Sequence, residues 1–259
     1  MPYLMYKTGF IYKLETAFKM LMDYQVIFFG EQHDVPESHE AELGVLTGLA
    51  GLDPKVVLAL EMFERDVQEI LDLYLKGKIS EEEFLDNSRP WPNYQTNYRP
   101  LIEFSKSRGI PVVAANIPRR AAAAVAAANR ISPEVLGEDA VYLPEKPPFD
   151  SRKYYQLFKA AIDDMPSTGA MRQTAPSALY KAQLVKDAAM AASLDPYLDR
   201  RILFCCGHFH SDYHLGIAYQ LKRKYHRLKM AVIAMSSAVY EVRMHRISEL
   251  ADFFWIPDE

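Results

Sequence analysis

The sequence has very little cysteine. Among its 259 residues the only cysteines are Cys205 and Cys206, which are adjacent. Neighbouring residues of a strand point to opposite faces of a sheet, so we expect no ordinary disulfide between them. The Cys-x-x-Cys spacing of zinc sites is absent as well. Both cysteines are therefore predicted to be small buried hydrophobic residues.

Long hydrophobic runs and an excess of positive charge are also lacking. No apolar stretch is long enough to span a bilayer, and the first residues do not form a signal peptide. The formal net charge is −4, so the chain has no electrostatic footprint for nucleic acid. As written, the chain is expected to be cytoplasmic. A periplasmic or membrane-anchored protein that had lost its leader would have the same sequence.

Several catalytic motifs are absent too, including G-x-S-x-G, a Walker A loop, H-E-x-x-H and a G-x-G-x-x-G after the first strand. What the chain does contain is a set of short apolar runs that end in polar residues. The runs have the length and the β-branched or aromatic content of buried strands. They cover residues 26–29, 56–60, 112–115 and 202–206, and are followed by Glu31 and His33, by Glu61, by Asn116 and by His208.

Helical segments separate these runs, and this alternation predicts an α/β fold with a mostly parallel sheet and helices on both faces. The helical stretch from Arg119 to Leu194 is too long for a simple crossover. We expect residues 119–195 to form a helical cap over the C-terminal strand ends, within a single α/β domain of residues 1–259. A last strand at the sheet edge is expected over 239–244.

Glu31 and His33 follow Gly30 directly after the first apolar run. In an extended chain positions i and i+2 share a face, so both side chains can point into one site. Parallel strands end at the same edge of a sheet, which is where α/β folds bind their ligands. Together with Glu61 and His208, these residues are our candidate catalytic site. The alternative is a carboxylate at a helix start and a surface histidine.

A second group of histidines has the pattern His-x-His-x-x-x-His at positions 208, 210 and 214. If His210 begins a helix, His210 and His214 lie one turn apart on one face, which is a metal-ligand spacing. The candidate metal ligands are therefore His33, Glu61, His208 and His210. In the competing interpretation, which we favour for His210 and His214, these two histidines are helix-capping residues.

The predicted cap carries further polar and aromatic candidates. Tyr180, Gln183 and Asp187 are spaced i, i+3 and i+7 and share one helix face, which points either into the site or to solvent. Five tyrosines are placed in this region: Tyr94, Tyr98, Tyr154, Tyr155 and Tyr180.

Tyrosine and histidine can both be axial ligands of haem iron, and an arginine such as Arg119 can pair with a propionate. We therefore take Tyr94, Tyr98, Tyr180 and Arg119 as candidate cofactor-binding residues. Packing of the tyrosines against Met and Phe is the simpler alternative.

Five segments, in the same order, resemble the ChaN-like haem-binding family, over roughly residues 25–221. That family belongs to a superfamily with Tiki metalloproteases, TraB proteins and erythromycin esterases. The segments are FGEQHD (29–34), LALEMF (58–63), PVVAANIPR (111–119), YKAQLVKD (180–187) with Met190-Ala191, and Gly207-His208 with Gly216-Ile217.

The resemblance implies an α/β core with helical additions, and a site built from Glu31, His33, Glu61 and His208. It also implies haem or iron binding, with haem between cap and sheet or at the interface of a homodimer. A divalent-metal-dependent hydrolase is the alternative. In it His33, His208 and a carboxylate would hold Mn²⁺ or Zn²⁺, and Glu31 or Glu61 would be the general base. A third reading is a scaffold in which these residues only stabilise the strand ends.

Overall fold

The computed structural model describes residues 2–164, 174–236 and 247–258, and the strand expected over 239–244 lies outside them. Its centre is an eight-stranded sheet in the order β2-β1-β8-β7-β3-β6-β4-β5. The strands are β1 (Tyr3–Tyr6), β2 (Ile11–Lys13), β3 (Val26–Glu31), β4 (Val56–Glu64), β5 (Val112–Asn116), β6 (Arg201–Gly207), β7 (Met230–Met235) and β8 (Phe253–Ile256).

Six neighbouring strands, in the order β8-β7-β3-β6-β4-β5, pair in parallel. The antiparallel pairs of the described residues are β1 with β2 and β1 with β8. The predicted α/β fold with a mostly parallel sheet is therefore confirmed. The four apolar runs form β3, β4, β5 and β6, so their polar end residues lie along one edge of the sheet. The register places Glu31 of β3 opposite Gly207 of β6, and Leu60 of β4 opposite Cys205.

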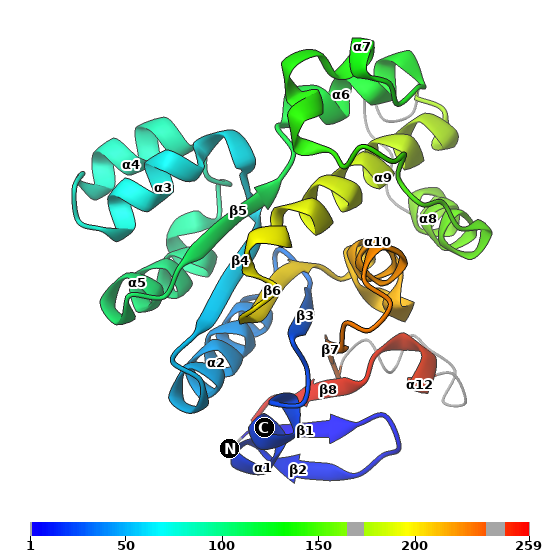
Figure 1. Cartoon of the computed structure of the whole chain (residues 1–259). Helices are drawn as coiled ribbons and strands as arrows, with labels where there is room; N and C mark the ends of the chain where they lie inside the picture. The colour runs from blue at the N-terminus through cyan, green and yellow to red at the C-terminus, as the bar shows by residue number, and fades with distance from the viewer. Residues whose placement is uncertain (1, 165–173, 237–246, 259) are drawn as a thin grey trace.

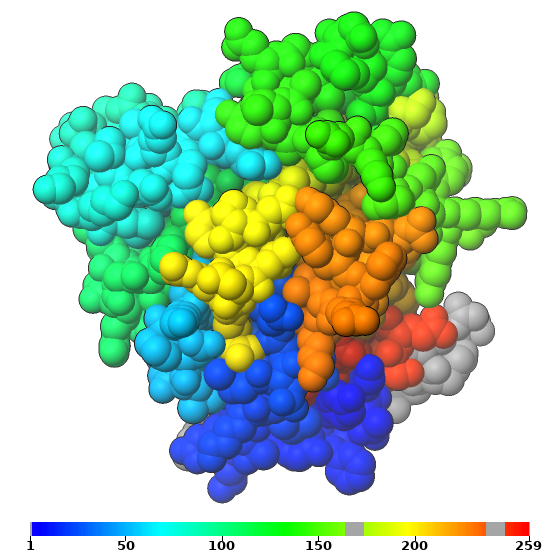
Figure 2. Space-filling model, in the orientation of Figure 1, coloured from blue at the N-terminus to red at the C-terminus, as the bar shows by residue number. Residues whose placement is uncertain are grey.

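Helices cover both faces of this sheet (Figure 1). The first face packs against α1 (Leu14–Leu21), α2 (Pro36–Leu52), α3 (Gln68–Leu75), α4 (Glu81–Ser88), the π-helix Tyr94–Tyr98 and α5 (Arg99–Arg108). The second face packs against α9 (Pro176–Ser193), α10 (Ile217–Lys224) and α12 (Ile247–Leu250). In Figure 2 the side chains of α10, in orange, lie between those of α9 and the red C-terminal segment.

Side-chain alternation decides which face each strand-end carboxylate takes. Ile27 and Phe29 of β3 pack into the core of the first face, and Glu31 continues this alternation. Val57 and Ala59 of β4 pack into the core of the second face, and Glu61 continues that one. Glu31, the last residue of β3, and Glu61, near the end of β4, therefore point to opposite faces of the sheet.

Three further helices lie beyond this layer. They are α6 (Arg119–Ala128), α7 (Pro133–Leu136) and α8 (Arg152–Asp164), with α6 and α8 packed on α9 and α7 packed on α6. Alanine on α6 allows its close approach to α9, around Ala121, Val125 and Ala189. Within the described ranges, no helix combines the length and the apolar content needed to cross a bilayer.

Candidate functional site

A cavity of about 570 Å³ lies at the C-terminal ends of β3, β4 and β6. Its polar lining includes Glu31, His33, Glu61, His208 and His210. Its apolar lining comes from α8 and α9, with Phe158, Ala161, Ile162, Leu179 and Ala182. The four predicted catalytic residues, and all four predicted metal ligands, therefore line one cavity.

His33 and Glu31 form a hydrogen-bonded pair at this edge. His33 Nδ1 donates to Glu31 Oε1 at 2.6 Å, and the imidazole also packs edge-on against Trp91. Although burial disfavours the charged imidazole, the bond to Glu31 and the nearby Glu61 carboxylate raise the pKa of His33. The ring is thus fixed by its Nδ1, while 39% of the side chain remains exposed.

Behind this pair, on the first face, Glu31 belongs to a buried cluster. The Tyr98 hydroxyl donates to Glu31 Oε1 at 2.6 Å. His39 Nδ1, on α2, lies 3.1 Å from Glu31 Oε2 and 3.0 Å from Glu42 Oε2. Although burial alone would raise it, the hydrogen bonds from His33 and His39 lower the pKa of Glu31. Burial and the adjacent Glu31 carboxylate raise the pKa of Glu42 well above its usual range, so we take Glu42 as neutral.

On the second face Glu61 belongs to another buried cluster. His210 lies between two carboxyls, with Nε2 3.1 Å from Glu61 Oε1 and Nδ1 2.5 Å from Asp187 Oδ1. Although burial opposes its charge, the Glu61 and Asp187 carboxyls raise the pKa of His210 to about 10. Burial alone would raise the pKa of Glu61, but the His210 imidazolium lowers it to about 2. The Tyr154 hydroxyl donates to Asp187 Oδ2 at 2.8 Å, and Gln183 contacts His210.

Gly207 lies between the two clusters and keeps them close together. Its backbone N–H donates to Glu61 Oε2 at 2.8 Å. A Cβ atom at this position would lie 2.8 Å from His33 Nε2 and 3.5 Å from Glu61 Oε2. Only glycine therefore allows the His33 ring to lie over the end of β6, beside Glu61.

His208 lies at the strand end, where the sequence placed it, whereas His210 does not. His208 is half-exposed, lines the cavity and bonds through Nδ1 to Asp212 Oδ2 at 2.8 Å. The interpretation of His210 as a helix-capping residue is wrong, because its ring is buried between Glu61 and Asp187. His214 lies elsewhere, with Nε2 3.3 Å from Asp252.

Comparisons with known proteins identify the family and the fold. The family model described as "Haem-binding uptake, Tiki superfamily, ChaN" matches residues 17–221. The chain belongs to this family. ChaN of Campylobacter jejuni, a solved structure described as showing cofacial haem binding, has the same fold. It superposes with a TM-score of 0.75 at 18% identity, covering 100% of this chain and 97% of that one.

More distant similarities extend beyond the ChaN family. A bacterial protein toxin structure matches with a TM-score of 0.50 at 14% identity, covering 96% of this chain and 39% of the toxin chain. The chloroplastic protein RETICULATA-RELATED 5 of Arabidopsis thaliana is 22% identical over 256 residues, covering 92% of this chain. The chain spans only 35% of that protein's length, so the similarity concerns one part of it.

The candidate cofactor-binding residues are not brought together. Tyr94 is buried against Phe63 and Phe84 in the core of the first face. Tyr98 lies on the same π-helix and bonds to Glu31. The expectation that Tyr94 and Tyr98 belong to the cap is therefore wrong. Arg119 is exposed at the start of α6 and does not line the cavity.

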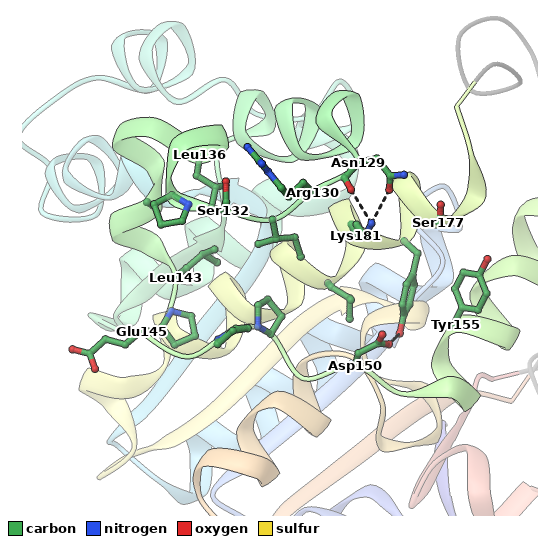
Figure 3. A pocket seen from close by; sticks show the side chains of 18 of the residues that line it. Asn129, Arg130, Ser132, Leu136, Leu143, Glu145, Asp150, Tyr155, Ser177 and Lys181 are labelled. Atoms are coloured by element: carbon green, nitrogen blue, oxygen red, sulfur yellow. Dashed lines mark hydrogen bonds between the residues drawn. The ribbon is translucent and has the colours of Figure 1, made fainter.

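Tyr180 lines a different pocket of about 880 Å³, between α7, the segment 143–150 and helices α8 and α9 (Figure 3). Its hydroxyl donates to Asp150 Oδ1 at 2.6 Å. Lys181, on the same helix, bonds to Asn129 at the end of α6. The face shared by Gln183 and Asp187, by contrast, points inward to His210 and not to solvent.

Sequence reasoning missed His39 and Glu42 as members of the site. Both occupy the buried face of α2, in line with Val45, Leu46 and Leu49. A histidine and a glutamate at apolar positions of an amphipathic helix were the available signal. For His210 the signal was the spacing, because Gly207-x-x-His210 repeats Gly30-x-x-His33.

Proposed function

We propose that this protein binds haem in the cavity at the strand ends, with His33 as the iron ligand. Membership of the haem-binding ChaN family and the fold shared with the haem-binding Campylobacter ChaN support this proposal. Family and fold alone do not assign a site, so the argument rests on the cavity and on the His33 imidazole.

The orientation of His33 is the observation that carries the proposal. Histidines that ligate metals usually donate their other ring N–H to a carboxylate or a carbonyl, which fixes the ring and raises its basicity. The Nδ1 of His33 donates in this way to Glu31, and Nε2 forms no hydrogen bond with the described residues. The ring lines the cavity and stays partly exposed, so its Nε2 is free to ligate iron.

The cavity also has the character that a porphyrin requires. Cofactor sites have volumes of about 300–1,000 Å³ and are mostly apolar. Here α8 and α9 supply apolar side chains opposite the polar strand ends. Lys186 lines the same cavity and forms no ion pair within the described ranges, so it is available to a propionate.

Haemin titration of the purified protein tests the proposal. We expect a saturable change in the Soret band at one haemin per chain, and a loss of affinity of more than about tenfold in His33→Gln. His208→Gln changes the same cavity, and His226→Gln, at an exposed position far from it, is the remote control. Unchanged affinity in His33→Gln with loss in Tyr180→Phe would place haem in the pocket of Figure 3 and contradict the proposal.

A second candidate is divalent-metal-dependent hydrolysis, favoured by the position of Glu61 beside His33. Both side chains approach Gly207, and Glu61 is a carboxylate at neutral pH because its pKa is about 2. A metal ion held by His33 and Glu61 would lower the pKa of a bound water. Metal analysis of the same preparations tests this alternative. One divalent ion per chain, lost in both His33→Gln and Glu61→Gln, would support it, and weak non-saturating haemin uptake would then exclude the haem proposal.

A further inference from the structure

A second group of metal-capable side chains lies behind His33 and shares only Glu31 with the lining of the cavity. Glu31, His39 and Glu42 each offer one ligand atom, and these atoms lie within 4.8 Å of one another. His39 Nδ1 is 3.1 Å from Glu31 Oε2 and 3.0 Å from Glu42 Oε2. In a tetrahedral zinc site with bonds of about 2.0–2.1 Å, two ligand atoms are about 3.3 Å apart. The spacing of the two pairs is therefore close to that of a filled site.

Two carboxyl oxygens in this cluster receive no hydrogen bond from any described residue outside the cluster. They are Glu31 Oε2 and Glu42 Oε1, and both side chains are at least 98% buried. Buried polar atoms are nearly always satisfied, so these two oxygens depend on a proton or a cation held within the cluster. His39 has a single Nδ1–H, which is directed at both Glu42 Oε2 and Glu31 Oε2, and the proton of the neutral Glu42 carboxyl bonds to Glu31. One proton therefore joins the two carboxyls, in a place where a cation can replace it.

The surrounding contacts already orient the three side chains as ligands. His39 Nε2 lies 3.0 Å from the backbone carbonyl of His33, so its N–H is fixed there and Nδ1 is directed to the carboxylates. Asn93 and Asn97 bond to the same carbonyl and hold it in place. Tyr98 and His33 both bond to Glu31 Oε1, and Oε2 is directed at His39. Such outer contacts are typical of metal sites.

We propose that Glu31, His39 and Glu42 bind a divalent transition-metal ion, such as Zn²⁺ or Mn²⁺, in a buried site separate from the haem cavity. One imidazole nitrogen with two carboxylate oxygens suits these ions. The proposal does not depend on haem binding, since His39 and Glu42 are not part of the cavity lining and His33 is not one of the three ligands.

Charge balance permits the exchange in a buried place. Without metal, the cluster holds one carboxylate, one imidazolium and one neutral carboxyl, and its net charge is zero. A divalent ion displaces the Nδ1 proton of His39 and the carboxyl proton of Glu42, and the net charge is again zero. The ion therefore enters without leaving an uncompensated charge, which would be costly at this depth.

Zn²⁺ binding to the purified full chain, after removal of metal by a chelator and refolding with or without Zn²⁺, tests the site. We expect one Zn²⁺ per chain, and the release of about two protons per ion, measured by calorimetry in buffers of different ionisation enthalpy. Failure of the wild-type chain to retain Zn²⁺ under these conditions would overturn the proposal.

Glu42→Gln is the decisive variant. Glutamine is nearly isosteric with a neutral glutamic acid and carries an N–H where that acid carries its proton, so the fold should persist while Zn²⁺ is lost. His39→Gln should lose Zn²⁺ as well, and thermal unfolding of both variants without metal checks that they are folded. Retention of one Zn²⁺ by both variants contradicts the site.

Two further variants separate this site from the cavity. His208→Gln and Lys186→Gln, which change the cavity lining but not the cluster, should keep Zn²⁺ with its proton release. Loss of Zn²⁺ in either variant would move the ion to the cavity and overturn the proposal. Haemin uptake by Glu42→Gln is expected to equal that of the wild type. Failure of haem binding would leave the Zn²⁺ result standing, and the reverse is also true.

Discussion

The two faces of the sheet carry two buried clusters of the same composition, each with one histidine between two carboxyls. On the second face His210 uses one ring nitrogen for Glu61 and the other for Asp187. On the first face His39 directs Nδ1 at both Glu31 and Glu42, and its Nε2 donates to the backbone carbonyl of His33. In the second cluster each carboxyl therefore has its own ring nitrogen, whereas in the first Glu31 and Glu42 share one nitrogen and depend on a proton between them.

This difference shows that a list of residue types does not define a site. Both histidines have a pKa raised to about 10, against the effect of burial and because of their neighbouring carboxyls. One cluster is satisfied internally and stabilises the strand ends, while the other is satisfied fully only when a cation or a proton joins it. Which nitrogen faces which oxygen decides between these outcomes.

The largest expected effect comes from removing each central histidine. His210→Ala leaves Glu61 and Asp187 buried without a cation, so we expect a loss of about 3–5 kcal/mol in the free energy of unfolding. In His39→Ala, Glu42 is neutral and Glu31 keeps its hydrogen bonds from His33 and Tyr98. We therefore expect a smaller loss of about 1–3 kcal/mol in the free energy of unfolding. Urea unfolding of both variants measures the difference, and equal losses would contradict the comparison.

The pH dependence provides the control for this prediction. The folded pKa of His210 is raised from 6.5 to about 10, so its contribution to stability is complete below pH 6.5 and is lost as the pH rises through 10. The difference between wild type and His210→Ala should therefore shrink from pH 6.5 to pH 10. Substitution of the exposed His226 should change stability by less than about 0.5 kcal/mol at any pH.

A smaller effect distinguishes the tyrosines that support the two clusters. Among the described residues, Asp187 Oδ2 has Tyr154 as its partner, whereas Glu31 Oε1 has both Tyr98 and His33. We expect Tyr154→Phe to cost about 1.5–3 kcal/mol, and Tyr98→Phe about 0.5–1.5 kcal/mol. Chemical denaturation of both variants, with Tyr155→Phe as the control that removes no hydrogen bond between side chains, measures the order. A larger loss in Tyr98→Phe would reverse our interpretation.

An effect of similar size concerns the contact between the clusters. Gly207→Ala places a methyl group against His33, and we expect a loss of about 1–3 kcal/mol from this overpacking. The backbone of Gly207 tolerates alanine, so the cost arises from the displaced ring. Gly51→Ala, in α2 with nothing near its added Cβ, should instead stabilise the chain by up to about 1 kcal/mol. Thermal unfolding and the NMR signals of the His33 ring test both variants.

Much of the fold could be predicted from the sequence. The four apolar runs became β3, β4, β5 and β6, because buried parallel strands need continuous apolar residues on both faces. The convergence of Glu31, His33, Glu61 and His208 on one cavity followed from the parallel direction of these strands. The tyrosines of the π-helix were misplaced, because chain order alone did not show on which side of the sheet Tyr94 and Tyr98 would pack.

The roles of individual histidines could not be predicted in the same way. His210 follows a strand end as His208 does, and only the 3₁₀ turn after Gly207 directs one ring to Glu61 and the other to Asp212. His39 and Glu42 reach Glu31 from α2, a different element, so no local pattern records the contact.

The sequence by itself determined the strands, their parallel direction, and the carboxylates and histidines that gather at one edge of the sheet. It could do so because periodicity and residue type are local properties. The tertiary structure decided which carboxyl shares which imidazole, and on which face of the sheet. Those pairings depend on a register of a single residue and on distances of about 3 Å between elements far apart in the chain, where burial makes each pairing strongly favourable or costly.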